Sequence, residues 1–516
     1  MLGKISNYYK SKTTRKYAIV STGFAVITLL FFYAFIYNDI LETSRCGVNL
    51  WHDLVEGKLR YFYARRTDMP AIAYQRVVGA SYEFPIYIIF AIWNFPLFLL
   101  EKFAHVDIFS SVLCLMWAKT ILLAFVILLC QEIAKICKKL GMSKDTIAMV
   151  VMLFVTANFL TTSVVMMASY EVISLYFSLI AINKYMEGNM RGFLLYFTIA
   201  VSMKYFALFI FIPLLLLKEK NIFKIAINII VSILPVLACR LLIPMGISYP
   251  EVSDASQMIS AYATSIITAS TSTSSAIAEA ISANASYGMG IGNLGFLYAL
   301  KYYLEIGMGR MYYSVFAFVT LYVICYIVKI DKQEELNKWV IYVCALAYGL
   351  LFTTFFTHAY WIVLLVPFLV ILIGQNSKYL YVNMLLEMAL TWGMIMAQIV
   401  RFSWLYGSAI AECMYIPKIV GELTSEEYEQ LSLQVFLQNM GMDFDNILNG
   451  LTGLGMGIYI SCLVLFFVLN FPKANWKFKI TCEGESIKWW LVGIRVLAGW
   501  CIALIPIGFL VLQRML

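Results

Sequence analysis

Charged residues are scarce in this sequence. Only 13% of the 516 residues are Asp, Glu, Lys or Arg, whereas ~25% is usual in soluble domains, and 62% are hydrophobic. The mean hydropathy is +0.81. This composition excludes an ordinary soluble protein, because the polar residues are too few to cover an aqueous surface. It predicts an integral membrane protein.

Histidine is also scarce, and the cysteines show no pairing pattern. The chain has three His and eleven Cys, and no two cysteines stand in a CxxC spacing. Most cysteines, such as Cys114, Cys130 and Cys325, lie inside apolar segments. An odd number of thiols in such surroundings argues against a disulfide framework or a zinc site. We therefore expect no metal and no cofactor.

Positive charge gathers at the ends of apolar segments. The formal net charge is +8, and the Lys and Arg residues form short clusters that flank those segments. Such clusters set the orientation of membrane helices or contact anionic head groups. We expect the lipid bilayer as a partner and no nucleic acid.

Apolar windows long enough to cross a ~30 Å hydrocarbon core recur from Tyr17 to Leu512. They predict an all-α polytopic membrane protein with about 12–13 transmembrane helices and extracytoplasmic juxtamembrane helices. The first span has no small-residue cleavage site, so we expect a retained helix and not a signal peptide. The later crossings are expected at 108–134, 146–167, 172–186, 222–243, 311–329, 338–356, 360–374, 379–404, 451–471 and 488–512.

Charge asymmetry predicts the orientation. The segment KISNYYKSKTTRKY carries five Lys or Arg residues, which predicts a cytoplasmic N-terminus and places Asp39, after the first span, on the outside. Residues 38–84 are mixed in character and predict short amphipathic helices on the membrane surface. Residues 85–102 are apolar but contain Pro85 and Pro96. We expect them to enter the outer leaflet without crossing, which keeps the basic residues 136–145 cytoplasmic.

Lys204 lies near the middle of the apolar residues 193–217, which have the charged sequences NMRG and KEKN on either side. Since both flanks are expected to be cytoplasmic, this segment predicts a broken helix or a hairpin pair with Lys204 at its apex. Residues 244–300 predict a long outer loop. Its centre, 253–287, is rich in Ser, Thr and Ala, and we expect it to be mobile when empty.

The predicted topology brings Asp39, Glu171, Lys204 and His358 to the outer side. An ionisable residue within a span costs ~2.5–3.5 kcal/mol on insertion scales, so several of them together indicate a functional site. Ordinary roles remain open for each. Asp39 can end a helix in solvated surroundings, Glu171 can cap the following helix, and Lys204 can extend to the head groups. His358 can bond a neighbouring loop, and Arg240 can be an interfacial anchor or a phosphate ligand.

The order of several features resembles a known superfamily. An acid follows the first span, the surface segment ends in YEFP, an acid opens the helix after SYE, and SMKYFALFIFIPLLLL and HAYWIVLLVPF follow. In this order they resemble the GT-C superfamily of polyprenyl-phosphate-sugar glycosyltransferases, nearest to its bacterial mannosyltransferase and arabinofuranosyltransferase branch. The chain differs from the usual pattern at Glu83, where relatives have proline, at Glu171, and at Ala359 after the histidine.

The resemblance implies a fold division, a reaction and roles for residues. Residues 1–375, with loops 38–84 and 244–300, would form the catalytic transmembrane module, and 376–516 would add C-terminal transmembrane helices. Asp39 would be the general base that activates an acceptor hydroxyl. The implied ligands of the donor phosphate are Lys204, Arg240 and His358, and those of the donor or acceptor sugar are Tyr82, Glu83, Glu171 and Tyr360.

The implied activity is transfer of a hexose or pentose from a polyprenyl-phosphate donor to an extracytoplasmic glycolipid or cell-envelope glycan. The reaction would invert the anomeric centre, need no metal, and take place at a bacterial plasma membrane. The alternative is a polytopic transporter or a flippase for lipid-linked sugars, in which the same residues line a path. The sequence shows no clear internal repeat, and its polar residues gather on one side. Both features favour the transferase. A non-catalytic scaffold explains the hydropathy but not this convergence.

Overall fold

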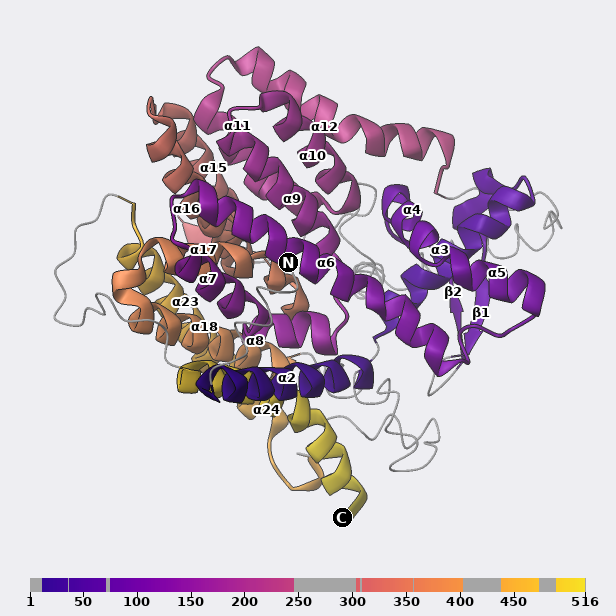
Figure 1. The fold of residues 1–516 in the computed structure, drawn as a ribbon. Helices are drawn as coiled ribbons and strands as arrows, with labels where there is room; N and C mark the ends of the chain where they lie inside the picture. Colours follow the sequence, from indigo (N-terminus) through magenta and orange to yellow (C-terminus); the bar gives the residue numbers. More distant parts are fainter. Residues whose placement is uncertain are drawn as a thin grey trace.

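The computed structural model describes residues 12–35, 37–70, 75–245, 303–306, 309–355, 357–401, 438–472 and 489–515. It shows a bundle of apolar helices with a smaller lobe at one end, formed by residues 37–70 and 75–109 (Figure 1). The expected Ser-, Thr- and Ala-rich segment 253–287 lies outside the described residues.

The bundle consists of helices, some of them short 3-10 or π-helical turns labelled η. They are α2 (Lys12–Ala34), α6 (Val112–Lys139), α7 (Lys144–Val155), α8 (Asn158–Leu160), η2 (Thr161–Met166), α9 (Glu171–Met186), α10 (Met190–Met203), η3 (Tyr205–Ala207), α11 (Leu208–Lys218), α12 (Ile222–Leu242), α15 (Tyr313–Ile327), α16 (Gln333–Thr354), η6 (Ala359–Leu364), α17 (Val366–Gln375), η7 (Ser377–Tyr379), α18 (Leu380–Arg401), α23 (Phe444–Leu469) and α24 (Trp489–Met515). Every crossing expected from the sequence coincides with one of these helices or with consecutive ones, so the helix positions are confirmed.

Among the described residues, 6 helices are long and apolar enough to cross a membrane, or 7 if the bent pair of α4 (Phe84–Trp93) and α5 (Phe95–Ala104) counts as one span. Further apolar helices in this part of the chain are 10–17 residues long. The chain is therefore a polytopic membrane protein, and its described residues are all-α apart from two short hairpins that the sequence did not predict. One hairpin pairs β1 (Thr67–Pro70) with β2 (Gln75–Val78), and the other pairs β3 (Tyr303–Ile306) with β4 (Gly309–Tyr312). The total of 12–13 crossings stays a prediction.

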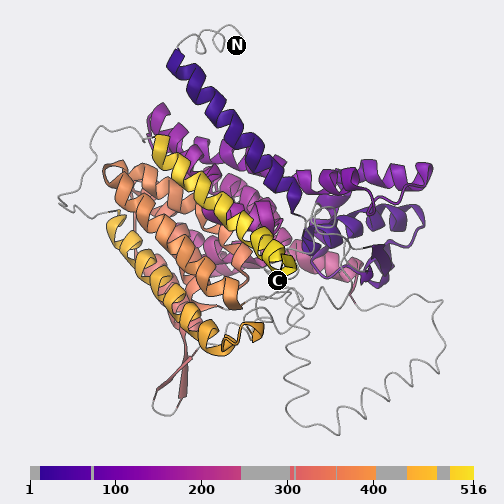
Figure 2. The ribbon, with the colours of Figure 1, turned by 90° about the horizontal axis from the view of Figure 1, so that it is seen from below.

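The first and last helices lie side by side along the bundle (Figure 2). Trp500 of α24 donates a 3.1 Å hydrogen bond to the Thr28 hydroxyl of α2, and its ring packs edge-on against Phe24 at 5.2 Å. Arg495, also on α24, forms a fully buried ion pair with Glu387 of α18. The Trp500 contacts join α24 to the N-terminal helix α2, and the ion pair joins α24 to α18. A charge buried among apolar helices is stable only beside its partner.

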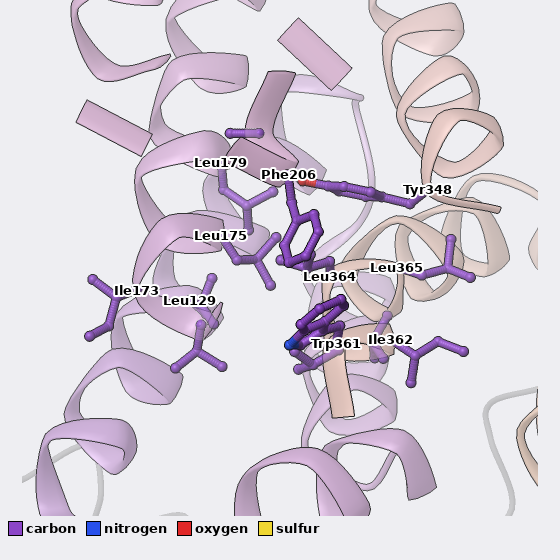
Figure 3. Close-up of a cluster of buried hydrophobic side chains, with 14 of the residues drawn as sticks. Leu129, Ile173, Leu175, Leu179, Phe206, Tyr348, Trp361, Ile362, Leu364 and Leu365 are labelled. Atoms are coloured by element: carbon purple, nitrogen blue, oxygen red, sulfur yellow. The ribbon is translucent and has the colours of Figure 1, made fainter. Parts of the chain in front are cut away.

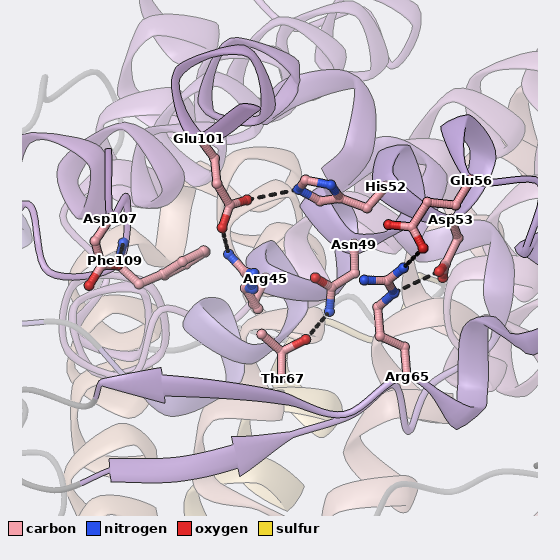
Figure 4. A network of polar contacts seen from close by, with 10 residues as sticks. All are labelled: Arg45, Asn49, His52, Asp53, Glu56, Arg65, Thr67, Glu101, Asp107 and Phe109. Atoms are coloured by element: carbon pink, nitrogen blue, oxygen red, sulfur yellow. Dashed lines mark hydrogen bonds and ion pairs between the residues drawn. The ribbon is translucent and has the colours of Figure 1, made fainter. Parts of the chain in front are cut away.

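The lobe contains α3 (Asn38–Val55), η1 (Leu59–Ala64), β1 (Thr67–Pro70), β2 (Gln75–Val78), α4 (Phe84–Trp93) and α5 (Phe95–Ala104). One face of α3 carries polar side chains that fasten the other parts (Figure 4). Arg45 donates to Glu101 of α5 at 2.6 Å, and His52 bonds the same carboxylate at 3.0 Å. Asn49 donates to Thr67 of β1 at 3.0 Å. The expected amphipathic helix is therefore present, and its polar face holds α5 and the hairpin.

Helices α4 and α5 meet at Asn94 with a bend of 66°. A proline lies in the first turn of each helix, where the missing N–H costs nothing, so the second proline starts a new helix and redirects the chain. Ile92 and Phe103 on this pair are exposed, at 67% and 71%. An apolar, bent pair with such exposed side chains suits a helix that enters one leaflet. That it does not cross stays a prediction.

The chain breaks at Lys204, as the sequence predicted. Helix α10 ends at Met203, Lys204 has extended backbone angles, and η3 leads into α11. Phe206, two residues after this break, belongs to a packed apolar layer that includes Leu175 and Trp361 (Figure 3). The rings of Phe206 and Trp361 are 4.6 Å apart. This layer supports the polar residues described next.

Candidate functional site

The predicted polar residues stand at the ends of elements, where the lobe meets the bundle. Asp39 lies in the first turn of α3, Glu171 is the first residue of α9, and Lys204 lies in the break before η3. His358 directly precedes η6. At such positions the chain changes direction, so side chains from distant parts of the sequence can meet without interrupting a helix.

Asp39 is half-buried and accepts a 2.9 Å hydrogen bond from the hydroxyl of Tyr360. Burial raises the pKa of Asp39 to about 6, and the nearby Glu42 adds to the rise. The positive charge of Lys204 and the bond from Tyr360 act in the opposite direction. A carboxylate with this pKa is ionised at neutral pH, yet it is more basic than an ordinary aspartate. That combination suits a general base.

Lys204 is held by a carboxylate and by aromatic rings. Its ammonium lies 3.1 Å from Glu171 Oε1, and the two side chains are 12% and 1% exposed. It also lies 4.3 Å from the ring centroid of Tyr82, 4.9 Å from that of Tyr170 and 5.8 Å from that of Trp361. Ion pairing and cation–π contacts together offset the cost of burying the charge. The Lys204 ammonium is therefore directed at partners within the protein.

Glu171 has a second partner, because the Ser169 hydroxyl donates to its Oε2 at 2.5 Å. Both carboxylate oxygens of this fully buried residue are thus engaged. Its position at the start of α9 also agrees with the capping role considered from the sequence, since a negative charge is favoured at a helix N-terminus. The capping and site roles coexist at this residue.

His358 lies between aromatic rings in the same cluster. It stacks on Tyr360 at 5.4 Å and meets Trp361 edge-on at 4.6 Å. Burial, reinforced by the charge of Lys204, lowers the pKa of His358 to about 4. The imidazole is therefore neutral at pH 7. That His358 is a ligand of the donor phosphate stays a prediction, and in this state the ring would act without a positive charge. It can offer one neutral N–H.

Arg240 and Glu83 form an ion pair with each other. Arg240 Nε donates to Glu83 Oε2 at 3.0 Å, and a second guanidinium nitrogen bonds the other carboxylate oxygen. The pair links the outer end of α12 to the residue that precedes α4, and Glu83 is only 6% exposed. The sequence assigned one residue to phosphate and the other to sugar. The structure shows that each is the other's partner.

Tyr82 is positioned by its backbone. The hydroxyl of Tyr87 accepts from the N–H groups of Ser81 and Tyr82, each at 2.9 Å, and the Tyr63 hydroxyl donates to the Tyr82 carbonyl at 2.9 Å. These three bonds fix the turn before α4. They hold the Tyr82 ring against Tyr170, with centroids 5.5 Å apart.

Three members of the site escaped the sequence reasoning. Tyr170 and Trp361 line the Lys204 ammonium, and Ser169 fixes Glu171. The available signal was their position, since each stands within two residues of a predicted site residue. Lys119, which lies in α6 among apolar residues, is a fourth polar group in this region that was not singled out.

The described site contains four acids, Asp39, Glu42, Glu83 and Glu171, and two basic side chains, Lys204 and Arg240, each of which is paired with one of these acids. An entering anion therefore has to share or replace a carboxylate at one of the cations. No group of three His, Cys, Asp or Glu side chains that could hold a metal ion occurs among the described residues. Comparison with models of protein families, with characterised proteins and with solved structures finds no match to this chain.

Proposed function

We propose that this chain is an integral membrane glycosyltransferase of the GT-C type. It transfers a sugar from a polyprenyl-phosphate donor to an extracytoplasmic glycolipid or cell-envelope glycan. The observation that carries the proposal is one cluster in which Asp39, hydrogen-bonded by Tyr360, is subject to the charge of Lys204, which pairs with Glu171 at 3.1 Å. A base and an anion ligand in one cluster are what transfer from a phosphate leaving group requires.

The proposed reaction is a direct displacement. Asp39 takes the proton from an acceptor hydroxyl while that oxygen bonds to the anomeric carbon. The bond from this carbon to the phosphate oxygen breaks, and its electron pair leaves with polyprenyl phosphate. Attack opposite the leaving group inverts the anomeric centre. Since phosphate is a good leaving group at neutral pH, one carboxylate is enough and no metal is needed.

The donor phosphate binds Lys204 in exchange for Glu171. The ammonium has three N–H donors and now meets one carboxylate oxygen, so a phosphate oxygen can join or replace that partner. His358 contributes a neutral N–H. Arg240 can serve the same purpose only after its pairing with Glu83 loosens. The aromatic rings around Lys204 and Asp39 supply flat apolar surfaces for a sugar.

The proposed orientation follows the positive-inside rule, with the N-terminus in the cytoplasm and the lobe outside a bacterial plasma membrane. The bent α4–α5 pair then lies at the outer leaflet. A donor lipid in that leaflet can place its phosphate at the site without leaving the membrane.

The test uses purified protein in lipid vesicles with a panel of polyprenyl-phosphate sugars, each tested with and without candidate acceptors. Cleavage of one donor, with release of polyprenyl phosphate, is the expected result. Movement of intact donors across the bilayer without cleavage would support the flippase instead.

A further inference from the structure

Lys119 is fully buried in α6, at 0% exposure, in a segment that is otherwise apolar. A charged side chain inside a membrane span is costly and is retained where it serves a purpose. The ammonium donates to three backbone carbonyls, those of Phe32, Phe35 and Val165. The bond to Val165 measures 2.7 Å. These three acceptors match the three N–H groups of a lysine.

The three carbonyls belong to two segments that lead into the site. Phe32 lies in the last turn of α2, whose carbonyls have no partner within the helix and carry the negative end of its dipole. Phe35 follows directly after this helix. Val165 lies in the π-helical turn η2. One cation thus caps the end of α2 and joins it to η2.

Each segment ends a few residues before an acid of the site. The chain runs from Phe35 to Asp39 and from Val165 to Glu171. Because the ammonium fixes both backbones to one point, it limits how far the two acids can move relative to each other. The neighbouring Thr120 adds a weaker tie, a 2.9 Å hydrogen bond between its hydroxyl and that of Tyr33 on α2.

We infer that Lys119 is a positioning residue, which holds the α2 end and η2 together so that Asp39 and Glu171 face one another beside Lys204. This inference rests on the proposed function, because only that function gives Asp39 and Glu171 their roles. The effect of Lys119 on the environment of Asp39 can nevertheless be measured without an activity assay. Lys119 touches no expected substrate, and it acts through the backbone of both segments.

The test places 3-fluorotyrosine at position 360 alone, where the hydroxyl donates to Asp39. The fluorine resonance then reports the ionisation of Asp39 in the intact protein. In the wild type the midpoint of this titration, the pH at which Asp39 is half ionised, is expected at about 6. In Lys119→Met the two segments separate and water enters, so the midpoint should fall by about one pH unit toward the ordinary aspartate value. Thr120→Val removes the bond to Tyr33 and the bond of the same hydroxyl to the Met116 carbonyl within α6, but leaves the three contacts of the Lys119 ammonium, so it should keep the wild-type midpoint.

Lys119→Arg provides a second variant if the methionine variant does not fold. Arginine keeps the charge but replaces a compact ammonium by a planar fork, which cannot meet three converging carbonyls equally well. The pH midpoint of Lys119→Arg should be lower than that of the wild type and higher than that of Lys119→Met. If Lys119→Arg is the only variant that folds, a midpoint below the wild-type value is the expected result. A wild-type midpoint in every Lys119 variant that folds, even with lowered thermal stability, would overturn the inference. Absence of sugar transfer by the wild type would instead contradict the proposed function.

Discussion

Tyr360 donates a hydrogen bond of 2.9 Å to Asp39, across 321 positions of the chain. The bond connects η6 of the bundle with the first turn of α3 in the lobe. Lys204 also acts on this region, because its charge lowers the pKa of Asp39 and its ammonium lies 5.8 Å from the ring centroid of Trp361, the residue after Tyr360. The lobe and the bundle therefore build the site together.

The first prediction concerns pH. A general base works only when it is deprotonated, so kcat/KM for transfer should rise with pH, reach half its maximum at about 6, the pKa of Asp39, and then level off. The hydrogen bond from Tyr360 stabilises the charged carboxylate and lowers this pKa. Tyr360→Phe removes the bond, so the midpoint should move to higher pH. Transfer rates across the pH range for both proteins test this.

Tyr185→Phe is the matched control for that experiment. Tyr185 is also a buried tyrosine, but its hydroxyl donates to the Leu214 carbonyl at 2.9 Å and has no contact with Asp39. Its midpoint should equal that of the wild type. An unchanged midpoint in Tyr360→Phe, or equal shifts in both variants, would show that Asp39 does not set the pH dependence.

Much of the fold could be predicted from the sequence, because membrane helices are marked by local composition. The apolar run 222–243 coincides with α12, and the charges around Lys204 indicated the break between α10 and α11. The first acid after the first span was enough to indicate Asp39. These features depend on residues that are neighbours in the sequence.

Pairings across the chain could not be predicted. Arg240 and Glu83 are 157 positions apart, and nothing in their local sequences indicates that they meet. The neutral state of His358 follows from its burial and from the charge of Lys204, a residue of a distant segment. The hairpin β1–β2 was missed because the segments around it favoured amphipathic helix. In each case the contact or the structure depends on tertiary packing, about which the local sequence pattern carries little information.

The second prediction concerns Glu171. Glu171→Gln removes the carboxylate that is paired with Lys204, so the donor phosphate no longer competes for the ammonium. Affinity for polyprenyl phosphate without a sugar should rise by about tenfold, which corresponds to ~1.4 kcal/mol. Binding measured in detergent micelles tests this. Glu187→Gln is the control, because Glu187 also pairs with lysines but lies beside Lys139 and Lys184, at the far end of α9. Weaker binding of polyprenyl phosphate by Glu171→Gln would contradict the proposal that the phosphate replaces Glu171 at Lys204.

The third prediction concerns stability. Arg495→Met leaves the buried carboxylate of Glu387 without its guanidinium, and loss of one partner of a buried pair costs ~3–5 kcal/mol. The double variant Arg495→Met/Glu387→Met removes both charges and should recover most of this loss. The thermal unfolding temperatures of the wild type and of both variants test this prediction. Equal destabilisation of the single and double variants would mean that packing, and not the unpaired charge, dominates.

The fourth prediction concerns orientation. Ser143 and Arg60 are both exposed and lie at opposite ends of the molecule, Ser143 before α7 and Arg60 in η1 of the lobe. In a background without other reactive cysteines, Arg60→Cys should react with an impermeant reagent added outside intact cells, and Ser143→Cys should react only after the membrane is opened. Labelling of Ser143→Cys from outside would reverse the proposed sidedness and place Asp39 in the cytoplasm.

The fifth prediction concerns Asp39 itself. Asp39→Asn keeps the size of the side chain but removes its basic oxygen, so the transfer rate should fall by about 10²–10⁴-fold while donor affinity and thermal stability stay close to those of the wild type. Glu42→Gln, Glu83→Gln and Glu171→Gln remove the other acids of this region and provide the comparison.

The most direct measurement is therefore kcat for sugar transfer by these four amide variants, assayed side by side with the wild type. The account predicts that Asp39→Asn alone loses most of its turnover at unchanged donor affinity. Near-normal turnover by Asp39→Asn, or a larger loss in one of the glutamate variants, would contradict the assignment of Asp39 as the base.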